Sequence, residues 1–377
     1  MSSRPTDVAK RPSLITPLMG LLVVVIFLLS YAVWQMGVFV GLITPFSHSI
    51  VSILLIVFPI VLVSAMALIQ RHSHPVLSII YTVSVLWFPM IIYLFIGTVL
   101  LSVFILAETY TSFAFDVTFW GQSIVLFVAA LLIYGIINAR TIRTKTYTIA
   151  SPELAKKWSG KKIVLFSDVH IGVVRGPRFM KRIVERVNKL SPDLVILAGD
   201  VIDGPKCDYE KGLAPLRDIR ALGGIIYTPG NHEDYNLEPE KFYPVMEQLT
   251  TMLIDQTMMF NETQITGIRF AHESLEATRT RLHSAGFDPL LPSIVILHDP
   301  TNTPVMQEAG VSLVVSGHTH KGQFFPSTLF MKMLYKEFAY GKNVNGKTTS
   351  ITTSGVGTTW PPIRIGSNPE IVTIIFE

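Results

Sequence analysis

The chain has 377 residues and a formal net charge of +4; hydrophobic residues make up 49% of it and charged residues only 15%. These averages combine an apolar first part with an ordinary globular second part, so we expect a two-part molecule. The single cysteine, Cys207, excludes a thiolate metal site and agrees with a reducing compartment.

The first 140 residues contain long stretches without any Asp, Glu, Lys or Arg. Because a bilayer core needs about 20 apolar residues per helix, they predict a four-helix transmembrane region with spans at about 14–34, 47–69, 76–107 and 121–139. Buried helices of a soluble core are the alternative, but such helices have one polar face and these segments do not. A cleaved signal peptide is disfavoured, because no small-residue cleavage site follows the first segment.

Basic residues lie on one side of the predicted spans: Arg4, Lys10, Arg11, Arg71, Arg140, Arg143 and Lys145. The positive-inside rule therefore predicts a cytoplasmic N-terminus and a cytoplasmic following domain, in the cell inner membrane. Residues 141–160 form an expected basic juxtamembrane linker, which suits an anionic leaflet. Nucleic-acid binding is the alternative for such a patch, but no recognition motif accompanies it, and we expect no nucleic-acid partner.

Five apolar runs rich in β-branched residues predict strands at 163–167, 194–198, 224–227, 294–297 and 313–316. Apolar residues at helical spacing predict helices over 177–190, 239–249, 273–285 and 303–309. Strands alternating with helices indicate an α/β domain over 161–377.

A polar motif follows each predicted strand: Asp168-Val169-His170, Gly199-Asp200-Val201-Ile202-Asp203, Gly230-Asn231-His232-Glu233, His298, and Gly317-His318-Thr319-His320. Ligands bind beyond the carboxyl ends of strands in α/β sheets, so these side chains are expected to converge. Imidazole nitrogens mixed with carboxylate and amide oxygens suit Mn, Fe, Co or Zn better than Mg or Ca.

In this order the five motifs resemble those of the calcineurin-like metallophosphoesterase superfamily, most closely its membrane-anchored bacterial branch. The resemblance implies a two-sheet αββα sandwich and two divalent metal ions, with Mn, Fe or Zn expected. It implies that Asp168, His170 and His320 hold the first ion, that Asn231, His298 and His318 hold the second, and that Asp200 bridges them. It also implies that His232 is a catalytic residue outside the ligand set, and that Asp203 orients either His232 or the loop rather than binding metal.

The expected activity is hydrolysis of a phosphate ester or pyrophosphate bond with two metals and without a covalent enzyme intermediate. Some members of the membrane-anchored branch act on nucleotide-linked lipid intermediates, so the resemblance also suggests a lipid-linked substrate. Two alternatives stay open. One is a general phosphomonoesterase or cyclic-nucleotide phosphodiesterase that the spans only localise; the other is a membrane sensor or scaffold with an idle phosphoesterase domain.

Two further features leave their role open. Arg175 and Lys321 lie near the ligand motifs, where each either meets a phosphate oxygen or is a solvated loop cation. Residues 324–340 mix aromatic and aliphatic residues with Lys332 and Lys336, which suits either the boundary of a membrane or the packing of a domain insert.

Overall fold

A computed structural model describes residues 15–377, except positions 40, 42, 44, 70–73, 109, 112–114, 204–207, 235–237 and 272. The chain divides into two compact units, Met1–Ala67 with Val83–Ala130, and Leu68–Thr82 with Leu131–Glu377. Several residues used in the sequence argument lie outside the described residues: Arg4, Lys10, Arg11, Arg71 and Cys207.

The apolar first part forms the helices α1 (Ile15–Phe39), α2 (Pro45–Ile69), α3 (Pro75–Val85), α4 (Trp87–Glu108) and α5 (Val117–Asn138). In the part of the chain that the structure describes, three helical stretches are long and apolar enough to cross a membrane: Ser49–Met66, Pro75–Glu108 and Val117–Asn138. The predicted span at 14–34 falls on α1, whose described apolar stretch, Val24–Phe39, is shorter. Three of the four predicted spans are therefore supported, and the first stays a prediction.

The long third span is interrupted rather than continuous. A turn at Leu86 separates α3 from α4, three residues before Pro89. Proline has no N–H, so Pro89 cannot donate to the carbonyl of Val85 four residues earlier, and the helical ladder breaks there. The Trp87 ring stacks on Phe58 at 4.6 Å, and its Nε1 donates to Ser30 Oγ at 3.4 Å.

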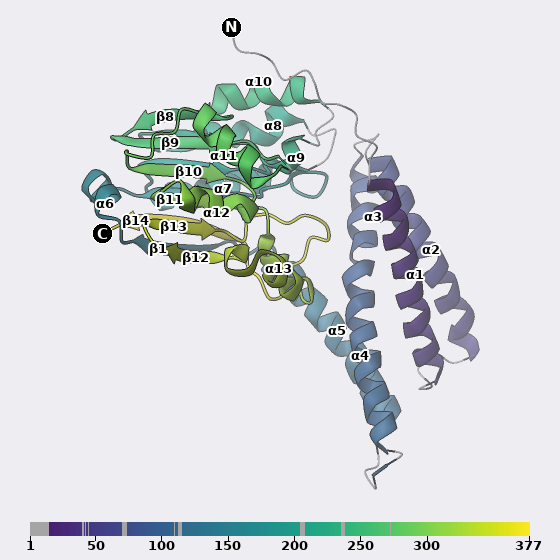
Figure 1. The fold of residues 1–377 in the computed structure, drawn as a ribbon. Coiled ribbons are helices and arrows are strands. Elements are labelled where there is room, and N and C mark those ends of the chain that lie inside the picture. Colours follow the sequence, from purple (N-terminus) through teal and green to yellow (C-terminus); the bar gives the residue numbers. More distant parts are fainter. Residues whose placement is uncertain are drawn as a thin grey trace. The chain divides into compact units, whose positions relative to one another are not determined.

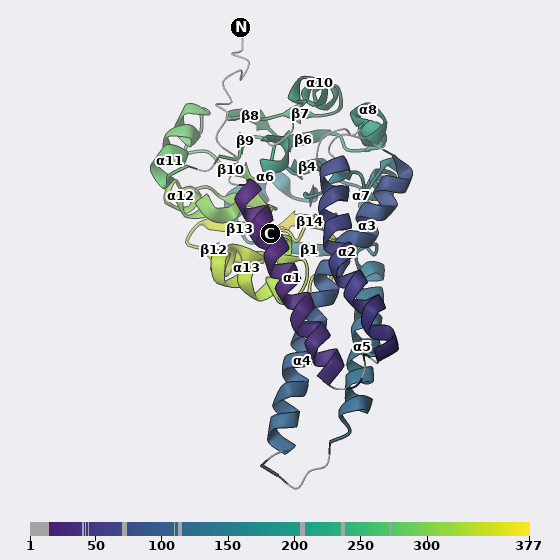
Figure 2. The ribbon, with the colours of Figure 1, turned by 90° about the vertical axis from the view of Figure 1, so that its right-hand side faces the viewer.

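The second part is built on two six-stranded sheets that lie face to face (Figures 1 and 2). The strand order is β1-β14-β2-β4-β6-β7 in the first sheet and β12-β13-β11-β10-β9-β8 in the second. Their bounds are β1 Arg143–Ile149, β2 Ile163–Phe166, β4 Leu194–Ala198, β6 Ile225–Thr228, β7 Thr251–Met252, β8 Gln256–Phe260, β9 Thr263–Ile268, β10 Ser293–Leu297, β11 Leu313–Ser316, β12 Gly341–Asn345, β13 Thr348–Thr352 and β14 Glu370–Phe376. A short pair, β3 (Ile171–Gly172) and β5 (Ile202–Asp203), lies beside them.

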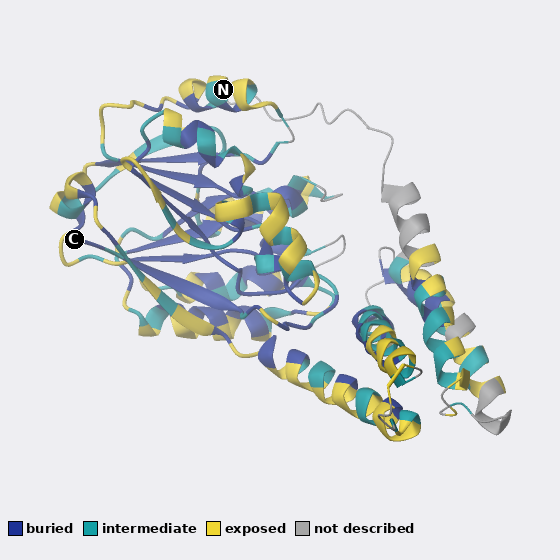
Figure 3. Cartoon of the chain, turned by 60° about the horizontal axis from the view of Figure 1, so that its bottom comes forward, coloured by how far each residue is buried: buried dark blue, intermediate teal, exposed yellow. Residues whose placement is uncertain are grey.

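Alternating side chains explain why the central strands are apolar throughout. In β2, Ile163 and Leu165 point into the core between the two sheets, whereas Val164 and Phe166 point into the core under the helices of the outer layer. Strands buried on both faces read as continuous apolar runs. The other sheet has the same arrangement, with a third core under its own helices. Figure 3 shows the strands buried between these layers, as in the expected αββα sandwich.

The helices that cover the sheets include those predicted from spacing. Helix α7 (Pro177–Lys189) buries Phe179, Ile183 and Val187, which are four residues apart along one face. The others are α6 Pro152–Trp158, α8 Tyr209–Leu213, α9 Asn231–Asp234, α10 Pro239–Leu249, α11 Leu275–Ser284, α12 Thr303–Glu308 and α13 Ser327–Tyr335, with 3-10 turns η1 Ala214–Asp218, η2 Pro300–Asn302, η3 His320–Gly322 and η4 Lys336–Ala339.

Residues 141–160, expected to be a basic linker, contain a strand and a helix that pack with the domain. Its first half is strand β1, which pairs in parallel with β14 from Arg143 opposite Glu370 to Ile149 opposite Phe376. Its second half contains α6, whose fully buried Trp158 donates from Nε1 to Thr263 Oγ1 at 2.9 Å. The partner of β1 is β14, at the far end of the chain. The sequence around β1 is rich in basic residues, and its strand could not be recognised without knowing this distant partner.

Candidate metal centre

The predicted ligand motifs lie at the carboxyl ends of parallel strands from both sheets. Asp168 and His170 follow β2, Asp200 follows β4, Asn231 follows β6, His298 follows β10, and His318 and His320 follow β11. Strands β2, β4 and β6 run in parallel within one sheet, and β10 and β11 do so within the other. The sandwich therefore brings residues 150 positions apart, Asp168 and His318, into hydrogen-bond contact.

Left-handed backbone conformations recur at these positions. The φ angle is 53° at Asp168, His170 and Asp200, 69° at His318 and 49° at His320. Side chains with a Cβ rarely adopt this region, and each instance costs on the order of 1–3 kcal/mol. Such strain persists only where the surrounding structure over-determines it, which is typical of functional sites.

The glycine of the Gly317-His318-Thr319-His320 motif is required by the neighbouring ligand motif. A Cβ added at Gly317 would lie 2.5 Å from Asp168 Oδ2 and 2.3 Å from Ser167 Oγ. Only glycine lets the loop after β11 approach the loop after β2 this closely. The same approach allows the amide of His318 to donate to Asp168 Oδ1 at 3.0 Å.

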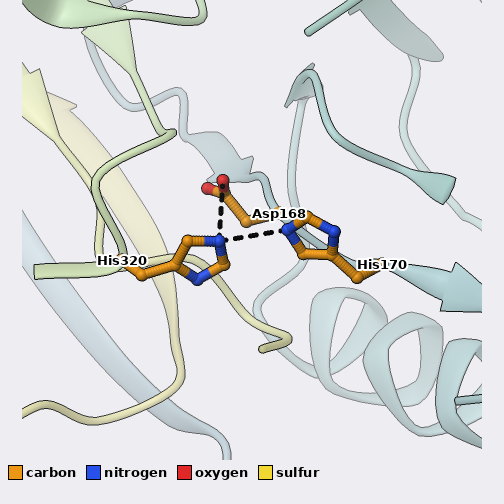
Figure 4. Close-up of side chains that lie close together, drawn as sticks. All are labelled: Asp168, His170 and His320. Carbon is orange, nitrogen blue, oxygen red and sulfur yellow. Dashed lines mark hydrogen bonds and ion pairs between the residues drawn. The ribbon is translucent and has the colours of Figure 1, made fainter. Parts of the chain in front are cut away.

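One group of converging side chains consists of Asp168, His170 and His320, all buried (Figure 4). The Nε2 atoms of the two imidazoles face each other at 3.0 Å, and His320 Nε2 lies 3.4 Å from Asp168 Oδ1. Separations near 3 Å are those of ligand atoms bound to one divalent cation, since bonds to such ions are about 2.0–2.2 Å long.

A second group contains Asp200, His298 and His318. His298 Nε2 lies 3.1 Å from Asp200 Oδ2, and His318 Nδ1 lies 2.7 Å from Asn231 Oδ1. The same Asp200 oxygen is 3.9 Å from His170 Nε2 in the first group. Asp200 therefore lies between the two groups, and all seven predicted ligand residues are gathered at one place.

The imidazole of His298 fits a cation because its other nitrogen is already committed. Nδ1 lies 2.7 Å from the carbonyl oxygen of Ala198, so it carries a proton and donates it. Nε2 faces the Asp200 carboxylate at 3.1 Å, and the neutral ring would present its lone pair to a cation bound there. An imidazole nitrogen beside a carboxylate oxygen is suited to bind a divalent cation.

The charges of the site favour a cation as well. Burial opposes the imidazolium of His298, but the Asp200 carboxylate outweighs burial and raises the pKa of His298 to about 10. A proton thus takes the position between these two groups that a metal ion could occupy. Burial and the neighbouring His232 lower the pKa of His170 to about 3, so its ring is neutral and able to coordinate. Burial also raises the pKa of Asp168 to about 6.

His232 lies beside the two groups and contacts Asp203. Its Nδ1 is 3.3 Å from Asp203 Oδ1, and its ring packs edge-on against His170 with centroids 4.6 Å apart. A quarter of the His232 side chain is exposed, whereas His170 is fully enclosed. Burial disfavours its imidazolium, but the charges of Asp200 and Asp203 raise the pKa of His232 to about 9. Its position also allows a metal-binding group with His170 and Asp200.

Glu233 is a supporting residue to which the sequence analysis assigned no role. Its buried carboxylate accepts backbone N–H groups from Asp200 at 2.9 Å, Val201 at 2.7 Å, Ile202 at 3.2 Å and Gly230 at 2.7 Å. It therefore fixes the loop after β4 to the loop after β6. Burial and the charge of Asp200 raise its pKa to about 7. Its signal in the sequence was its place as the last residue of the motif Gly230-Asn231-His232-Glu233.

Arg175 and Lys321 differ in their surroundings: Arg175 is buried and Lys321 is half-buried. Arg175 is buried; its Nη2 donates to Thr358 Oγ1 at 2.8 Å, and its guanidinium lies over the Phe179 ring. Arg175 is therefore not a solvated loop cation. These contacts are with Thr358 and Phe179, not with the candidate ligands. Lys321 is half-buried, with Nζ 4.4 Å from the centre of the Tyr340 ring.

Comparison with known proteins agrees with this geometry. Residues 161–322 match the calcineurin-like phosphoesterase family. A zebrafish (Danio rerio) transmembrane protein with metallophosphoesterase domain is 28% identical over 67% of this chain and 61% of its own length. A Helicobacter pylori metallophosphoesterase is 33% identical over 56% of this chain and 58% of its own length. One from Bacillus subtilis is 26% identical over 63% of this chain and 86% of its own.

The first two matches thus span about three fifths of those relatives. All three align over a region long enough to include the family segment, and the motifs that carry the ligand candidates, from Asp168 to His320, lie inside residues 161–322. Residues 161–322 are therefore similar to the calcineurin-like phosphoesterase family, and the candidate metal centre lies within this match.

Proposed function

We propose that the protein is a membrane-bound, dinuclear metal-dependent phosphoesterase that hydrolyses a phosphate ester or pyrophosphate bond. The observation that carries this proposal is the position of the Asp200 carboxylate, with Oδ2 3.1 Å from His298 Nε2 and 3.9 Å from His170 Nε2. A carboxylate that lies between two groups of candidate ligands is suited to hold two neighbouring cations.

These contacts support the proposed set of ligands. Asp168, His170 and His320 would hold one ion, Asn231, His298 and His318 the other, and Asp200 would serve both. Mn, Fe or Zn suits the mixture of imidazole, carboxylate and amide donors. When bound, two such ions supply a reactive water at neutral pH and neutralise charge on a phosphoryl group.

The protein's own contribution to proton transfer falls to His232. It is a partly exposed imidazole at the site, and its Nδ1 lies 3.3 Å from Asp203 Oδ1. Its Nε2 would protonate the departing oxygen of a substrate or donate a hydrogen bond to the phosphoryl group. Asp203 favours the charged form of the ring and fixes its orientation.

The membrane part has four spans in this proposal, at about 14–34, 47–69, 76–107 and 121–139, and the N-terminus and the catalytic domain are cytoplasmic. The basic residues that flank the spans support this orientation. The inner membrane of a bacterial cell is the proposed location. A transmembrane relative supports the association with a membrane.

The substrate is proposed to be phosphate-containing and lipid-linked, since the active site belongs to a membrane protein. A general phosphomonoesterase or cyclic-nucleotide phosphodiesterase, and a sensor with an idle domain, are the competing functions. The purified full chain, loaded with Mn in detergent, is assayed with p-nitrophenyl phosphate, bis(p-nitrophenyl) phosphate and a lipid pyrophosphate. Hydrolysis of the lipid pyrophosphate that EDTA abolishes and Mn restores is expected.

Each competing function gives a different result. Turnover of the soluble esters alone indicates the general phosphoesterase, and no hydrolysis with any metal indicates the idle domain. Asp200→Asn is the matched control, since it removes one carboxylate charge at nearly constant volume. It should lower kcat roughly a thousandfold or more, because metal catalysis contributes several kcal/mol.

A further inference from the structure

Helix α13 (Ser327–Tyr335) presents an apolar face to solvent directly beside the metal centre. None of its nine residues is buried. Leu329 is 54% exposed, Phe330 60%, Met333 77% and Leu334 58%. At spacings of one, four and five residues these side chains lie on one side of the helix. A soluble domain rarely exposes such a cluster unless it binds a partner or a membrane.

The helix is tied to the end of a membrane span. The amide of Phe325, just before α13, donates to Ile365 O at 3.0 Å, and the amide of Ile365 donates to Gln323 O at 3.1 Å. The amide of the adjacent Arg364 donates to Gly135 O in the last turns of α5 at 3.0 Å. One extended segment therefore connects the base of α13 with the helix end that leaves the bilayer.

The end of α5 also exposes apolar side chains of its own. Ile133 is 59% exposed, Tyr134 49% and Ile137 60%. These residues precede Asn138, whose Nδ2 donates to the carbonyls of Arg364 and Ser367 at 3.0 and 2.9 Å. The apolar surface of the span thus continues up to the segment that carries α13.

The lysines beside the apolar face of α13 favour a lipid surface over an apolar protein surface as its partner. Lys332 and Lys336 are exposed beside the apolar face. Between 319 and 347 the sequence has five lysines, and Glu337 is its one acidic residue. Cations that flank an apolar helical face suit the boundary between acyl chains and anionic head groups.

The helix is coupled to the ligands of the metal centre. The Tyr335 ring lies 6.1 Å from the His318 ring, and a Cβ added at Gly322, two residues after His320, would be 2.5 Å from Thr328 Cα. Docking of α13 on a surface would therefore set the metal centre close to that surface.

We propose that α13 inserts Leu329, Phe330, Met333 and Leu334 into the membrane that anchors the chain, with Lys332 and Lys336 at anionic head groups. The consequence for catalysis, preference for a phosphate held at the bilayer surface, rests on the proposed function. The insertion itself does not, and the two are tested separately.

The first test measures contact with lipid. The full chain with Cys207→Ser and Met333→Cys is labelled with the environment-sensitive fluorophore NBD and placed in vesicles of phosphatidylcholine with phosphatidylglycerol. A blue-shifted emission that brominated acyl chains quench is expected. The control label at Leu222→Cys, a position 97% exposed on the same unit, should stay in water.

Two results would overturn the proposal. One is a Met333 label as solvent-exposed as the Leu222 label. The other is a blue shift that brominated lipid leaves unquenched and that grows with the protein-to-lipid ratio, since this would identify a second copy of the chain as the occupant. Replacing phosphatidylglycerol by phosphatidylcholine should weaken the shift if the lysines contribute.

The second test measures the catalytic consequence. Phe330→Ser with Leu334→Ser should lower hydrolysis of a lipid-linked phosphate in vesicles about tenfold, while p-nitrophenyl phosphate is hydrolysed as by the parent. The matched control, Leu222→Ser with Leu290→Ser, changes two exposed leucines elsewhere and should change neither rate. Equal loss on both substrates would contradict the proposal. A parent without any activity would refute the proposed function and leave the fluorescence result valid.

Discussion

The guanidinium of Arg364 lies against the imidazole of His320, with Nη2 3.2 Å from Nδ1 and Nη1 donating to the His320 carbonyl at 2.9 Å. The side chain is fully buried, although no carboxylate forms a salt bridge with it among the described residues. Its Nη2 also donates to Ser354 O at 2.7 Å and to Gly357 O at 2.6 Å. Carbonyl oxygens thus replace a carboxylate as partners of this buried cation.

Arg364 also connects the catalytic domain to the last helix of the membrane region. Its amide donates to Gly135 O, and its carbonyl accepts from Asn138 Nδ2. Burial lowers the pKa of Arg364 to about 10, which leaves it charged at neutral pH. One residue therefore joins the end of α5 to the loop that carries a predicted metal ligand.

Substitution of Arg364 by Lys should weaken metal binding. The charge is kept, but a single ammonium group cannot reproduce the planar fork that serves several carbonyls at once. Orienting contacts of this kind are worth about 10- to 100-fold in metal affinity. The unfolding free energy should fall by about 2–4 kcal/mol, since buried acceptors lose their donor. Metal titration followed by mass spectrometry and thermal unfolding in detergent measure both effects.

Arg279→Lys is the matched control for Arg364→Lys. Arg279 is 41% exposed and pairs with Glu276 and Glu308 on the surface. Such pairs contribute little, so its stability should stay within about 0.5 kcal/mol of the parent and its metal affinity should be unchanged. Parental metal affinity in Arg364→Lys would show that the contact with His320 does not position the ligand.

The central strands and the polar motifs that follow them could be predicted from the sequence because both are local signals. The central strands are buried on both faces, so their apolar runs are continuous, and each is followed by a polar motif. The parallel strand ends then bring the motifs together whatever their separation along the chain.

The contacts that support the ligands could not be predicted, because each depends on residues far apart in the sequence. Arg364 reaches His320 across 44 positions, and β1 pairs with a strand more than 200 residues later. Neither contact leaves a periodic pattern. For Arg175, proximity to the first ligand motif suggested either a phosphate contact or a solvated cation, whereas its buried guanidinium lies over the Phe179 ring.

Gly355→Ala should disturb Asp168 more than backbone strain alone explains. Gly355 has a φ of 74°, and a Cβ there would lie 2.6 Å from Asp168 Cβ. The left-handed conformation costs an alanine about 1 kcal/mol, and overpacking adds about 1–3 kcal/mol. The expected result is a loss of unfolding free energy of about 3 kcal/mol together with a loss of bound metal.

Gly346→Ala separates the two effects. Gly346 also has a positive φ, 58°, but nothing lies within 4 Å of its added Cβ. Alanine there should cost only about 1 kcal/mol and leave the metal content unchanged. If both variants lose equal stability and both keep their metal, close approach of Gly355 to Asp168 is not what orders that ligand.

His232→Ala should separate catalysis from metal binding. His232 could complete a metal-binding group with His170 and Asp200, but its contact with Asp203 favours a role in proton transfer. If that role is correct, the variant keeps two metal ions per chain while kcat falls about 10²- to 10⁴-fold. Asp203→Asn should show a smaller loss of rate, since the imidazole stays and only its charged partner is removed.

His318→Ala is the comparison, because it removes a predicted ligand and should lower metal content and rate together. Mass spectrometry of the bound metal beside the rate on p-nitrophenyl phosphate distinguishes the two cases. A His232→Ala protein that loses one ion per chain would make His232 a ligand and leave the proton donor unassigned.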